Sequence, residues 1–400
     1  MLTNRKSHRV ILLSLIAFLS FLGCNKMENE TSSSLMMLSS SPQSLLNSDI
    51  AAKSSVITST TYFPMIDLSV LGNPKPECAY EVNNLGEVVG TVPGWGPPLA
   101  FLWSRQDGVK YLGTLGGVEH SFSMANDIND RGQVIGTSWE PTTPAMRAFL
   151  WSNNIGMVNL GTIEGENPPE DDFSYAFGIN NNGEIVGHVY GHAFLWTESR
   201  GMVNLSSPYY QSTAWDINDK GCIVGSFSME YPIHRAALWT DVGEMLDLGT
   251  INEHSYSQAL GINNLGEIVG GSSDGFGFCE FERIGSGIFY NIVFDHSCVP
   301  FMWTKKCGLF NLPMLGGAAG CAHAINDRGQ IVGWSLTAVD QEGNQKGHAF
   351  VWTSKNGIKD LGTLPGDAES VAYSINNLGQ IAGYSMKEDG TRHAVIWTVK

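Results

Sequence analysis

The sequence has little charge, and positive charge is the scarcer kind. Charged residues make up 16% of the 400 residues, and 23 Lys and Arg stand against 39 Asp and Glu, which gives a formal net charge of −16. The basic residues form no stripe along the chain. Nucleic acids and anionic lipid headgroups select clustered Lys and Arg, so we expect neither as a partner.

The N-terminal apolar run is also too short for a transmembrane helix. It extends from Val10 to Leu22, 13 residues where about 20 are needed to span a bilayer. Arg5, Lys6 and Arg9 precede it, so residues 1–23 are predicted to be a secretory signal peptide. Residues 24–60 are rich in Ser, Asn and Met, which predicts a flexible tether with a reach of about 30–35 Å.

The end of this leader resembles a bacterial lipoprotein box. In the stretch FLGC the small residue Gly23 precedes Cys24, although Phe21 departs from the usual aliphatic residue. The resemblance implies a lipid on Cys24, and Asn25 is not the aspartate retention signal of inner-membrane lipoproteins. We expect an exported protein on the outer membrane or cell surface that touches the membrane only through this anchor. Ordinary cleavage nearby would instead give a soluble periplasmic or extracellular protein.

Signatures of common catalytic centres are missing as well. The sequence shows no legible Ser, His and Asp arrangement, zinc-ligand spacing or phosphate-binding loop. A series of the form SxDxGxxW, as in sialidase propellers, is not cleanly present either. We therefore predict no cofactor, no metal and no assignable catalytic residue.

Repetition is what the sequence does contain. A motif of the form INxxGxIVG occurs seven times, each copy is followed by a tetrad ending in Trp, and a DLGTL-like element follows the first six tetrads and also precedes the first copy, at Leu68. The motif copies begin at Val82, Ile128, Ile179, Ile217, Ile262, Ile325 and Ile375. The tetrads end at Trp103, Trp151, Trp196, Trp239, Trp303, Trp352 and Trp397. A unit recurring every 49 residues or so indicates a repeat fold.

Two spacings inside the unit never vary. The Asn of IN and the Gly that ends IVG are seven residues apart, and each Trp is nine residues before the next Leu of DLGTL. Asn, Asp and Gly between β-forming residues predict a tight hairpin. The other connections vary in length, so all variable loops are expected on one face. Four strands in each of seven units predict an all-β, seven-bladed β-propeller over residues 61–400. An N-terminal strand near Tyr62 to Leu68 is expected to close the ring, and the alternative is that DLG forms the first strand of each blade and no such closure exists.

The unit also resembles the HAF repeats of a family of bacterial extracellular repeat proteins. The resemblance rests on HAFLW at His192 to Trp196, HAFVW at His348 to Trp352, the INxxGxIVG series and DLGTL, and it covers about 340 of the 400 residues. It implies no particular reaction. The His of the name is replaced elsewhere in the chain by Leu99, Arg147, Arg235 and Val299, so a structural hydrogen bond is the preferred interpretation of it.

Two further motif features are interpreted as structural. Asp127 to Gly132 resembles a calcium loop, but Arg131 and the equivalent Lys220 occupy a position where a cation would need a ligand oxygen. The repeated Trp shares one position in all seven units, which favours packing between blades.

Six cysteines follow Cys24, an even number that permits disulfides in an exported chain. The candidate pairs are Cys279 with Cys298 and Cys307 with Cys321, and free buried thiols are the alternative.

The variable face is where function is expected, because loops on a rigid scaffold carry binding sites. Two connections are distinctive, an acidic one and an aromatic insertion. Their candidate binding residues are Glu164, Glu166, Glu170, Asp171 and Asp172 in the first, and Phe276, Phe278, Phe281, Phe289, Tyr290, Asp295 and His296 in the second. The favoured hypothesis is a monomeric scaffold that binds a protein or a glycan. The alternative is a carbohydrate-active hydrolase or lyase with carboxylates at the channel mouth.

Overall fold

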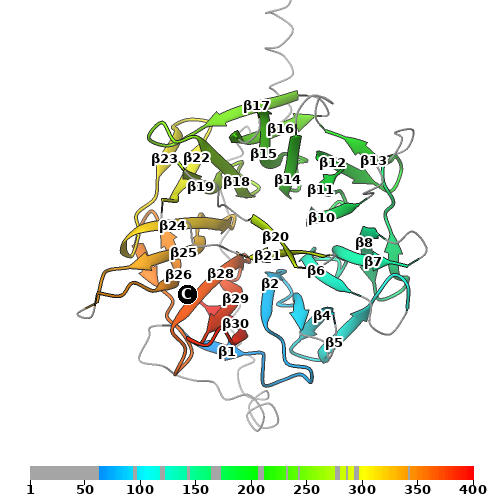
Figure 1. Ribbon diagram of the computed structural model, residues 1–400, viewed down its shortest axis with the longest axis horizontal. Helices are drawn as coiled ribbons and strands as arrows, with labels where there is room; N and C mark the ends of the chain where they lie inside the picture. Colours follow the sequence, from blue (N-terminus) through cyan, green and yellow to red (C-terminus); the bar gives the residue numbers. More distant parts are fainter. Residues whose placement is uncertain are drawn as a thin grey trace, which may run out of the picture. The chain divides into compact units, whose positions relative to one another are not determined.

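Seven four-stranded antiparallel sheets form a ring of blades in the computed structural model (Figure 1). The structure describes residues 63–400 except 93–96, 118–121, 142–144, 164–172, 206–210, 231–232, 242–243, 275–279, 285–286, 292–296 and 341–342. The predicted all-β, seven-bladed β-propeller is therefore confirmed. Within the described residues, no helix has the length and hydropathy needed to cross a bilayer.

The strands follow the repeat closely, and each blade is numbered by its order in the chain. Blades 1 and 2 consist of β2 (Cys78–Val82), β3 (Val88–Val92), β4 (Leu99–Ser104), β5 (Gly108–Gly113), and β6 (Ser123–Ile128), β7 (Val134–Glu140), β8 (Ala145–Ser152), β9 (Gly156–Asn159). Blades 3 and 4 consist of β10 (Ser174–Ile179), β11 (Ile185–Val189), β12 (His192–Thr197), β13 (Gly201–Asn204), and β14 (Gln211–Ile217), β15 (Ile223–Glu230), β16 (Ile233–Asp241), β17 (Glu244–Gly249). Blades 5 and 6 consist of β18 (Tyr256–Ile262), β19 (Ile268–Ser273), β22 (Val299–Thr304), β23 (Gly308–Asn311), and β24 (Gly316–Ile325), β25 (Ile331–Thr337), β26 (Gly347–Thr353), β27 (Gly357–Asp360).

Blade 7 combines strands from both ends of the described chain. It contains β28 (Glu369–Ile375), β29 (Gln380–Met386) and β30 (Arg392–Thr398), followed by β1 (Met65–Asp67) as its outer strand. β1 pairs antiparallel with β30, with Met65 opposite Trp397 and Asp67 opposite Val395. The contribution of this pairing to the stability of the ring is measurable by deleting β1.

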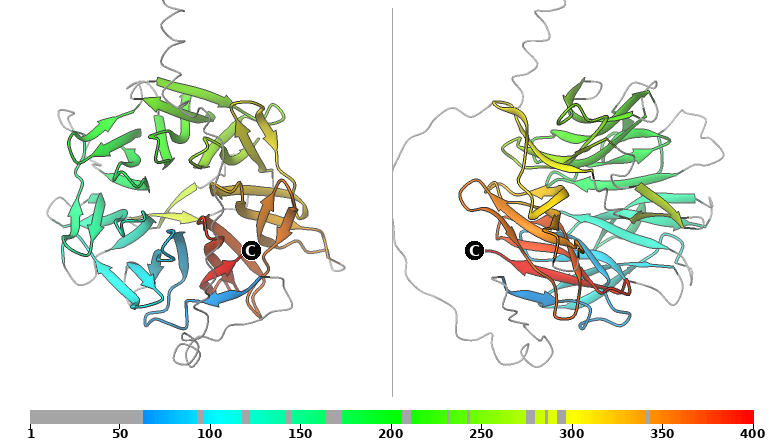
Figure 2. Two further views of the ribbon diagram at one scale, coloured as in Figure 1. Left: turned by 180° about the vertical axis from the view of Figure 1, so that it is seen from behind. Right: turned by 60° about the vertical axis from the view of Figure 1, so that its left-hand side comes forward.

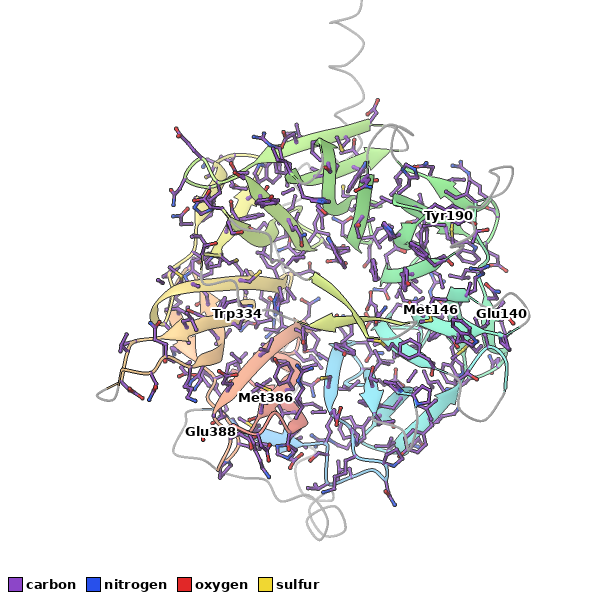
Figure 3. The ribbon with its side chains drawn as sticks, viewed as in Figure 1. Glu140, Met146, Tyr190, Trp334, Met386 and Glu388 are labelled. Atoms are coloured by element: carbon purple, nitrogen blue, oxygen red, sulfur yellow. The ribbon has the colours of Figure 1, made fainter. Side chains whose placement is uncertain are left out.

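The antiparallel pairing gives the ring two different ends. The turn end carries the INxxG turns between the first and second strands of each blade and the turns that follow each Trp. The loop end carries the variable connections, such as those that contain Tyr190 and Glu388 (Figure 3). At the loop end of blade 5, an additional hairpin of β20 (Glu280–Ile284) and β21 (Gly287–Asn291) is inserted between β19 and β22, and in both face-on views it projects onto the centre of the ring (Figures 1 and 2).

The hydrophobic core lies between neighbouring blades, because each sheet has a neighbouring sheet packed against each of its two faces. Trp397 of blade 7, for example, is fully buried and shares one cluster with Val332, Val351 and Leu361 of blade 6. Trp151 of blade 2 shares a cluster with side chains of blade 1 in the same way. The interpretation of the repeated Trp as packing between blades is confirmed at these positions.

Each inner strand contains a β-bulge that explains the last Gly of the motif. In blade 1 the register shifts between Ala79 and Glu81, and the six other blades shift at the equivalent place. A Cβ at Gly90 would overlap the carbonyl oxygen of Cys78, and the equivalent Gly of every other blade meets the same obstacle. Bulges re-aim side chains, and in blades 4, 6 and 7 two consecutive residues at the bulge, such as Trp215 and Asp216, line the central channel.

Candidate functional site

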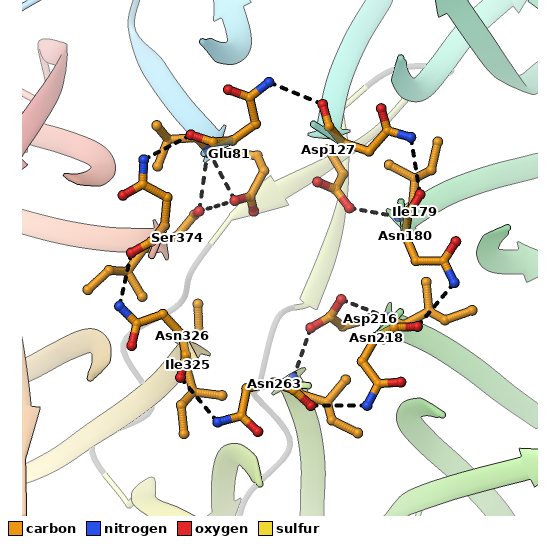
Figure 4. Close-up of a pocket in the computed structure, with 18 of the residues that line it drawn as sticks. Glu81, Asp127, Ile179, Asn180, Asp216, Asn218, Asn263, Ile325, Asn326 and Ser374 are labelled. Atoms are coloured by element: carbon orange, nitrogen blue, oxygen red, sulfur yellow. Dashed lines mark hydrogen bonds between the residues drawn. The ribbon is translucent and has the colours of Figure 1, made fainter. Parts of the chain in front are cut away.

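The candidate site is the central channel at the turn end, a cavity of about 290 Å³ lined by the ends of all seven inner strands. Its rim is formed by the first Asn of each repeat (Figure 4). In every blade the Nδ2 of this Asn donates a hydrogen bond to the backbone oxygen of the equivalent Asn in the next blade, at 2.8–3.1 Å. We call these seven residues the asparagine ring: Asn83, Asn129, Asn180, Asn218, Asn263, Asn326 and Asn376.

The asparagine ring is self-sufficient in hydrogen bonds. Each of its side chains is only 3–5% exposed. In blade 5, the Oδ1 of Asn263 accepts the N–H groups of Leu265 and Glu267, and its Nδ2 donates to Glu267 as well as to the next blade. Sequence reasoning treated this Asn only as a turn former and missed its role between blades. The available signal was the Glu or Gln found four residues after it in six of the seven repeats.

A second closed circle lies next to the first and involves the second residue of each turn. The backbone N–H of this residue donates to the side-chain Oδ1 of its counterpart in the next blade, at 2.8–2.9 Å around the whole ring. The residues alternate between amide and carboxylate: Asn84, Asp130, Asn181, Asp219, Asn264, Asp327 and Asn377. No two carboxylates are neighbours, and because seven is odd, the two adjacent amides meet between blades 7 and 1.

Three carboxyl groups line the channel inside these circles, and we call Glu81, Asp127 and Asp216 the channel carboxyls. Each stands two residues before an Asn of the ring. Asp127 accepts the N–H of Ile128 at 2.6 Å and that of Ile179 in the next blade at 2.7 Å. Asp216 accepts from Ile217 and Ile262 in the same way, and Glu81 bonds Ser374 and the N–H of Val82.

The enclosure of the channel carboxyls shifts their titration. Burial, together with the neighbouring charge of Asp216, raises the pKa of Asp127 to about 7. Burial also raises the pKa of Asp216 to about 6 and that of Glu81 well above its usual range. The two N–H donors on each Asp act in the opposite direction but do not cancel the effect of burial. Chemically, such groups could exchange protons near neutral pH.

Beyond the carboxyls, the bulged residues make the channel wall aromatic. Trp215 stacks on Phe177 with ring centroids 4.7 Å apart, and His323 stacks on Tyr373 at 5.5 Å. The Nδ1 of His323 bonds the carbonyl oxygen of Ala372 at 2.8 Å. The lining of the cavity contains no Lys or Arg from the described residues, so its charge is entirely acidic.

The structure describes only part of the predicted loop-end sites. Outside the described residues lie Cys24, Glu164, Glu166, Glu170, Asp171, Asp172, Phe276, Phe278, Cys279, Asp295 and His296. Phe281 is on β20, and Phe289 and Tyr290 are on β21, where Phe281 pairs with Tyr290. None of these loop residues lines the channel cavity at the turn end.

One of the two candidate disulfides is corrected by the structure. Cys307 is a free thiol in the exposed turn after Trp303, whereas Cys321 is buried in the inner strand of blade 6. Cys307 belongs to an outer turn of blade 5 and Cys321 to the inner strand of blade 6, and both thiols are free, so the pairing of Cys307 with Cys321 is wrong. Cys298, the described member of the other pair, is buried at the start of β22.

The namesake His of the repeat is a structural residue where the structure shows its contacts. His348 pairs with Asp360 at 2.8 Å, and His393 pairs with Asp367 at 2.9 Å. In blade 4, Arg235 replaces the His and pairs with Asp247, the counterpart of Asp360, at 2.9 Å. Among the described residues, no group of three or more His, Cys, Asp and Glu is placed to hold a metal ion.

No protein-family model matches the chain, and no curated protein matches its sequence. Solved structures resemble it in fold. The β-propeller domain of the Trilobed protease from Pyrococcus furiosus is 10% identical, with 81% of this chain and 95% of that chain covered and a TM-score of 0.47. A protein described as a gluconolactonase is 11% identical over 66% and 87% of the two chains, with a TM-score of 0.32. The extracellular domain of a protein described as a hybrid two-component system from B. thetaiotaomicron is 9% identical over 82% and 49%, with a TM-score of 0.34.

Proposed function

We propose that the protein is an exported, lipid-anchored scaffold that binds a protein or a glycan through the loop end of its propeller. The observation that carries this proposal is the asymmetry of the two ends. At the turn end, two closed circles of hydrogen bonds join all seven blades. At the loop end, the connection between the second and third strands varies from two residues, Tyr190 and Gly191, to the insertion that contains β20 and β21.

The loop end also offers a surface suited to polar ligands. A hollow of about 560 Å³ lies there beside β29 and β30, lined by Lys346, Gly366, Asp367, Ala368, Lys387, Glu388 and Asp389. Lys346 and Glu388 form an exposed ion pair at 3.4 Å across it. The hollow presents charged groups of both signs on a rigid support, in the loops that usually carry binding sites.

Export and anchoring are supported by the leader and by the HAF-type repeats. The basic start, the short apolar run and Cys24 after Gly23 fit a lipoprotein signal. Incorporation of a radioactive fatty acid into the wild-type chain, and not into a Cys24→Ala variant, is the expected result. An unlabelled wild-type chain would remove the anchor from the proposal.

The binding role is tested by exchanging loop-end segments in the full chain. One variant replaces residues 164–172 with Gly and Ser at equal length, and a second replaces residues 275–296 with an Asn-Gly turn. The matched control is Leu378→Ser at the turn end. Binding to a glycan array and to a panel of cell-surface proteins is expected to fall in one or both loop variants and to persist in the control. Ligand binding that survives both exchanges would contradict a loop-end site.

A hydrolase or lyase is a second candidate, because the channel carboxyls have raised pKa values in an acidic cavity. Against it, the oxygens of Asp127 and Asp216 are already occupied by backbone N–H groups of two blades each. Incubation of the chain with a mixed polysaccharide pool, followed by detection of new reducing or unsaturated ends, distinguishes the two. Activity that is lost in Asp127→Asn and in Asp216→Asn would replace the scaffold with an enzyme.

A further inference from the structure

The chain enters the propeller at the turn end. Met65, the first residue of β1, lies opposite Trp397, and the carbonyl oxygen of Pro64 accepts the N–H of Thr398. Trp397 is in turn opposite Ile381, directly after the INxxG turn of blade 7. The residues that join Cys24 to the propeller therefore arrive on the side of the ring that carries the short turns. A tether that is fixed to a bilayer at Cys24 thus meets the turn end first.

The turn end also carries most of the strongly exposed apolar side chains. Five large apolar residues of the described chain are more than 55% exposed, and four of them lie in short turns of this end: Leu85 at 68%, Ile155 at 74%, Leu265 at 61% and Leu378 at 56%. The fifth, Val339 at 58%, lies at the loop end. Three of the four occupy the same position of the INxxG turn, two residues after an Asn of the ring.

These apolar residues stand on a rigid and compact support. The turns of Leu378 and Leu85 are direct neighbours, since the N–H of Asn377 donates to the Oδ1 of Asn84 at 2.8 Å. Arg131, Lys220 and Arg328 hold the same turn position in blades 2, 4 and 6, and all three are exposed. Aliphatic tips interleaved with long cationic side chains suit the boundary between acyl chains and phosphate groups.

The charge of the turn end does not oppose such a contact. The short turns are defined as two sets of residues: the five that begin with each Asn of the ring, and those up to five places after each repeated Trp. Together they contain nine Lys and Arg and ten Asp and Glu. The whole chain has 23 against 39. The short turns are thus nearly neutral on a strongly acidic protein, although the channel carboxyls Glu81, Asp127 and Asp216 lie behind them in the central cavity.

We propose that the turn end of the propeller rests on the surface of a phospholipid bilayer, with Leu85, Ile155, Leu265 and Leu378 inserted among the headgroups. This inference builds on the proposed lipid anchor and orients the loop end away from the membrane. It also goes beyond the sequence-based expectation that the anchor is the only membrane contact. The anchor keeps the turn end at a high effective concentration near the lipid, so a few shallow apolar contacts suffice.

The native thiol of Cys307 provides the probe for this orientation. It is exposed in a turn of the turn end, whereas the other described cysteines are buried. The lipidated full chain with Cys279→Ser, labelled at Cys307 with an environment-sensitive fluorophore, is reconstituted into vesicles of phosphatidylethanolamine with a minority of phosphatidylglycerol, and the control below carries Cys279→Ser as well. The matched control carries the label at the loop end, in a Cys307→Ser, Val339→Cys variant. Quenching by aqueous iodide and by lipids with a quencher in the acyl chain is then measured for both.

The expected result is several-fold weaker iodide quenching and several-fold stronger lipid quenching at position 307 than at position 339. The triple variant Leu85→Ser, Leu265→Ser, Leu378→Ser is expected to abolish that difference while the chain still floats with the vesicles. Equal iodide access at both positions in a chain that floats would overturn the docking and leave the anchor intact. A chain that fails to float contradicts the anchor itself. Shielding of position 307 in the absence of vesicles would assign the surface to a second copy of the chain and overturn the lipid contact.

Discussion

The hydrogen bonds that join neighbouring blades are uniform at one end of the propeller and mixed at the other. At the turn end, the asparagine ring makes the same bond between blades at all seven interfaces. At the loop end, a buried Ser near the start of the inner strand accepts an N–H from the preceding blade, as Ser123 does from Ala100. This bond joins five interfaces, through Ser123, Ser174, Ser212, Ser257 and Ser370. At the two others a backbone bond takes its place, from the N–H of Gly320 to the carbonyl oxygen of Cys298 and from the N–H of Ala394 to that of Pro76.

The difference shows where the fold tolerates change. A link that is present at every interface fixes the spacing and tilt of the blades from one end. The other end can then use different links at different interfaces and accept an insertion such as the one that contains β20 and β21. The sequence is therefore invariant at the turn end, which fixes the arrangement of the blades, and varies at the loop end, which does not.

The largest difference in stability is expected between a variant without β1 and a variant without the loop-end insertion. Deleting residues 63–70 removes β1 with the buried Met65 and Leu68, and it exposes the edge of β30 from Val395 to Trp397. We expect this variant to lack a cooperative thermal transition by circular dichroism. Replacing residues 275–296 with an Asn-Gly turn is expected to leave the melting temperature within a few degrees of the wild type. An unchanged transition in the first variant would show that β1 does not stabilise the ring.

A smaller effect is expected from single polar residues at the two ends. Asn263→Ala removes two donated and two accepted hydrogen bonds of a buried side chain and leaves the backbone oxygen of Asn326 without this donor. We expect a loss of about 3 kcal/mol in the free energy of unfolding in urea. Asn344→Ala in an exposed loop-end turn, where the side chain only contacts Asp340, should cost less than about 0.5 kcal/mol. Equal losses would refute the difference between the ends.

The fold could be predicted from the sequence because its repeat carries the strand pattern seven times over. The fixed distance from Asn83 to Gly90 and from Trp103 to Leu112 correctly placed two hairpins per blade. The asparagine ring could not be predicted, because an Asn in a turn has the same local signature whether or not its amide reaches another blade. The channel carboxyls were missed for a similar reason, since the repeat position of Asp127 is Gly178, Gly261 or Ala324 in other units.

Disulfides were the weakest part of the sequence argument. Closeness along the chain suggested Cys307 and Cys321, yet these residues belong to an outer turn and an inner strand of different blades. Residues about fifty apart, such as Asn83 and Asn129, are in contact because they hold the same position in neighbouring blades. Sequence distance alone therefore does not identify the spatial neighbours of a cysteine.

The channel carboxyls add a pH dependence to the turn end. The folded-state pKa of Asp127, about 7, lies above its unfolded value near 3.8, so its contribution to stability is complete below pH 4 and is lost as the pH rises to 7. Asp127→Asn lacks this loss. Relative to wild type, the variant should therefore gain on the order of 1–3 kcal/mol between pH 4 and pH 7.5 in urea unfolding. Asp216→Asn should show the same gain completed nearer pH 6, and parallel curves for wild type and both variants would contradict the assigned shifts.

The smallest effect is expected at the outer strands near the loop end, where His348 pairs with the half-exposed Asp360. Burial lowers the pKa of His348, but the hydrogen bond and charge of Asp360 outweigh burial and raise it overall. The pair therefore stabilises the fold below pH 6.5 and ceases to do so as the His deprotonates. His348→Ala should cost about 0.5 kcal/mol at pH 5.5 and less at pH 8.5, and Asp360→Asn should cost the same without further loss in the double variant. A cost that is independent of pH would assign His348 to packing, so that its position in the repeat would depend on shape and not on charge.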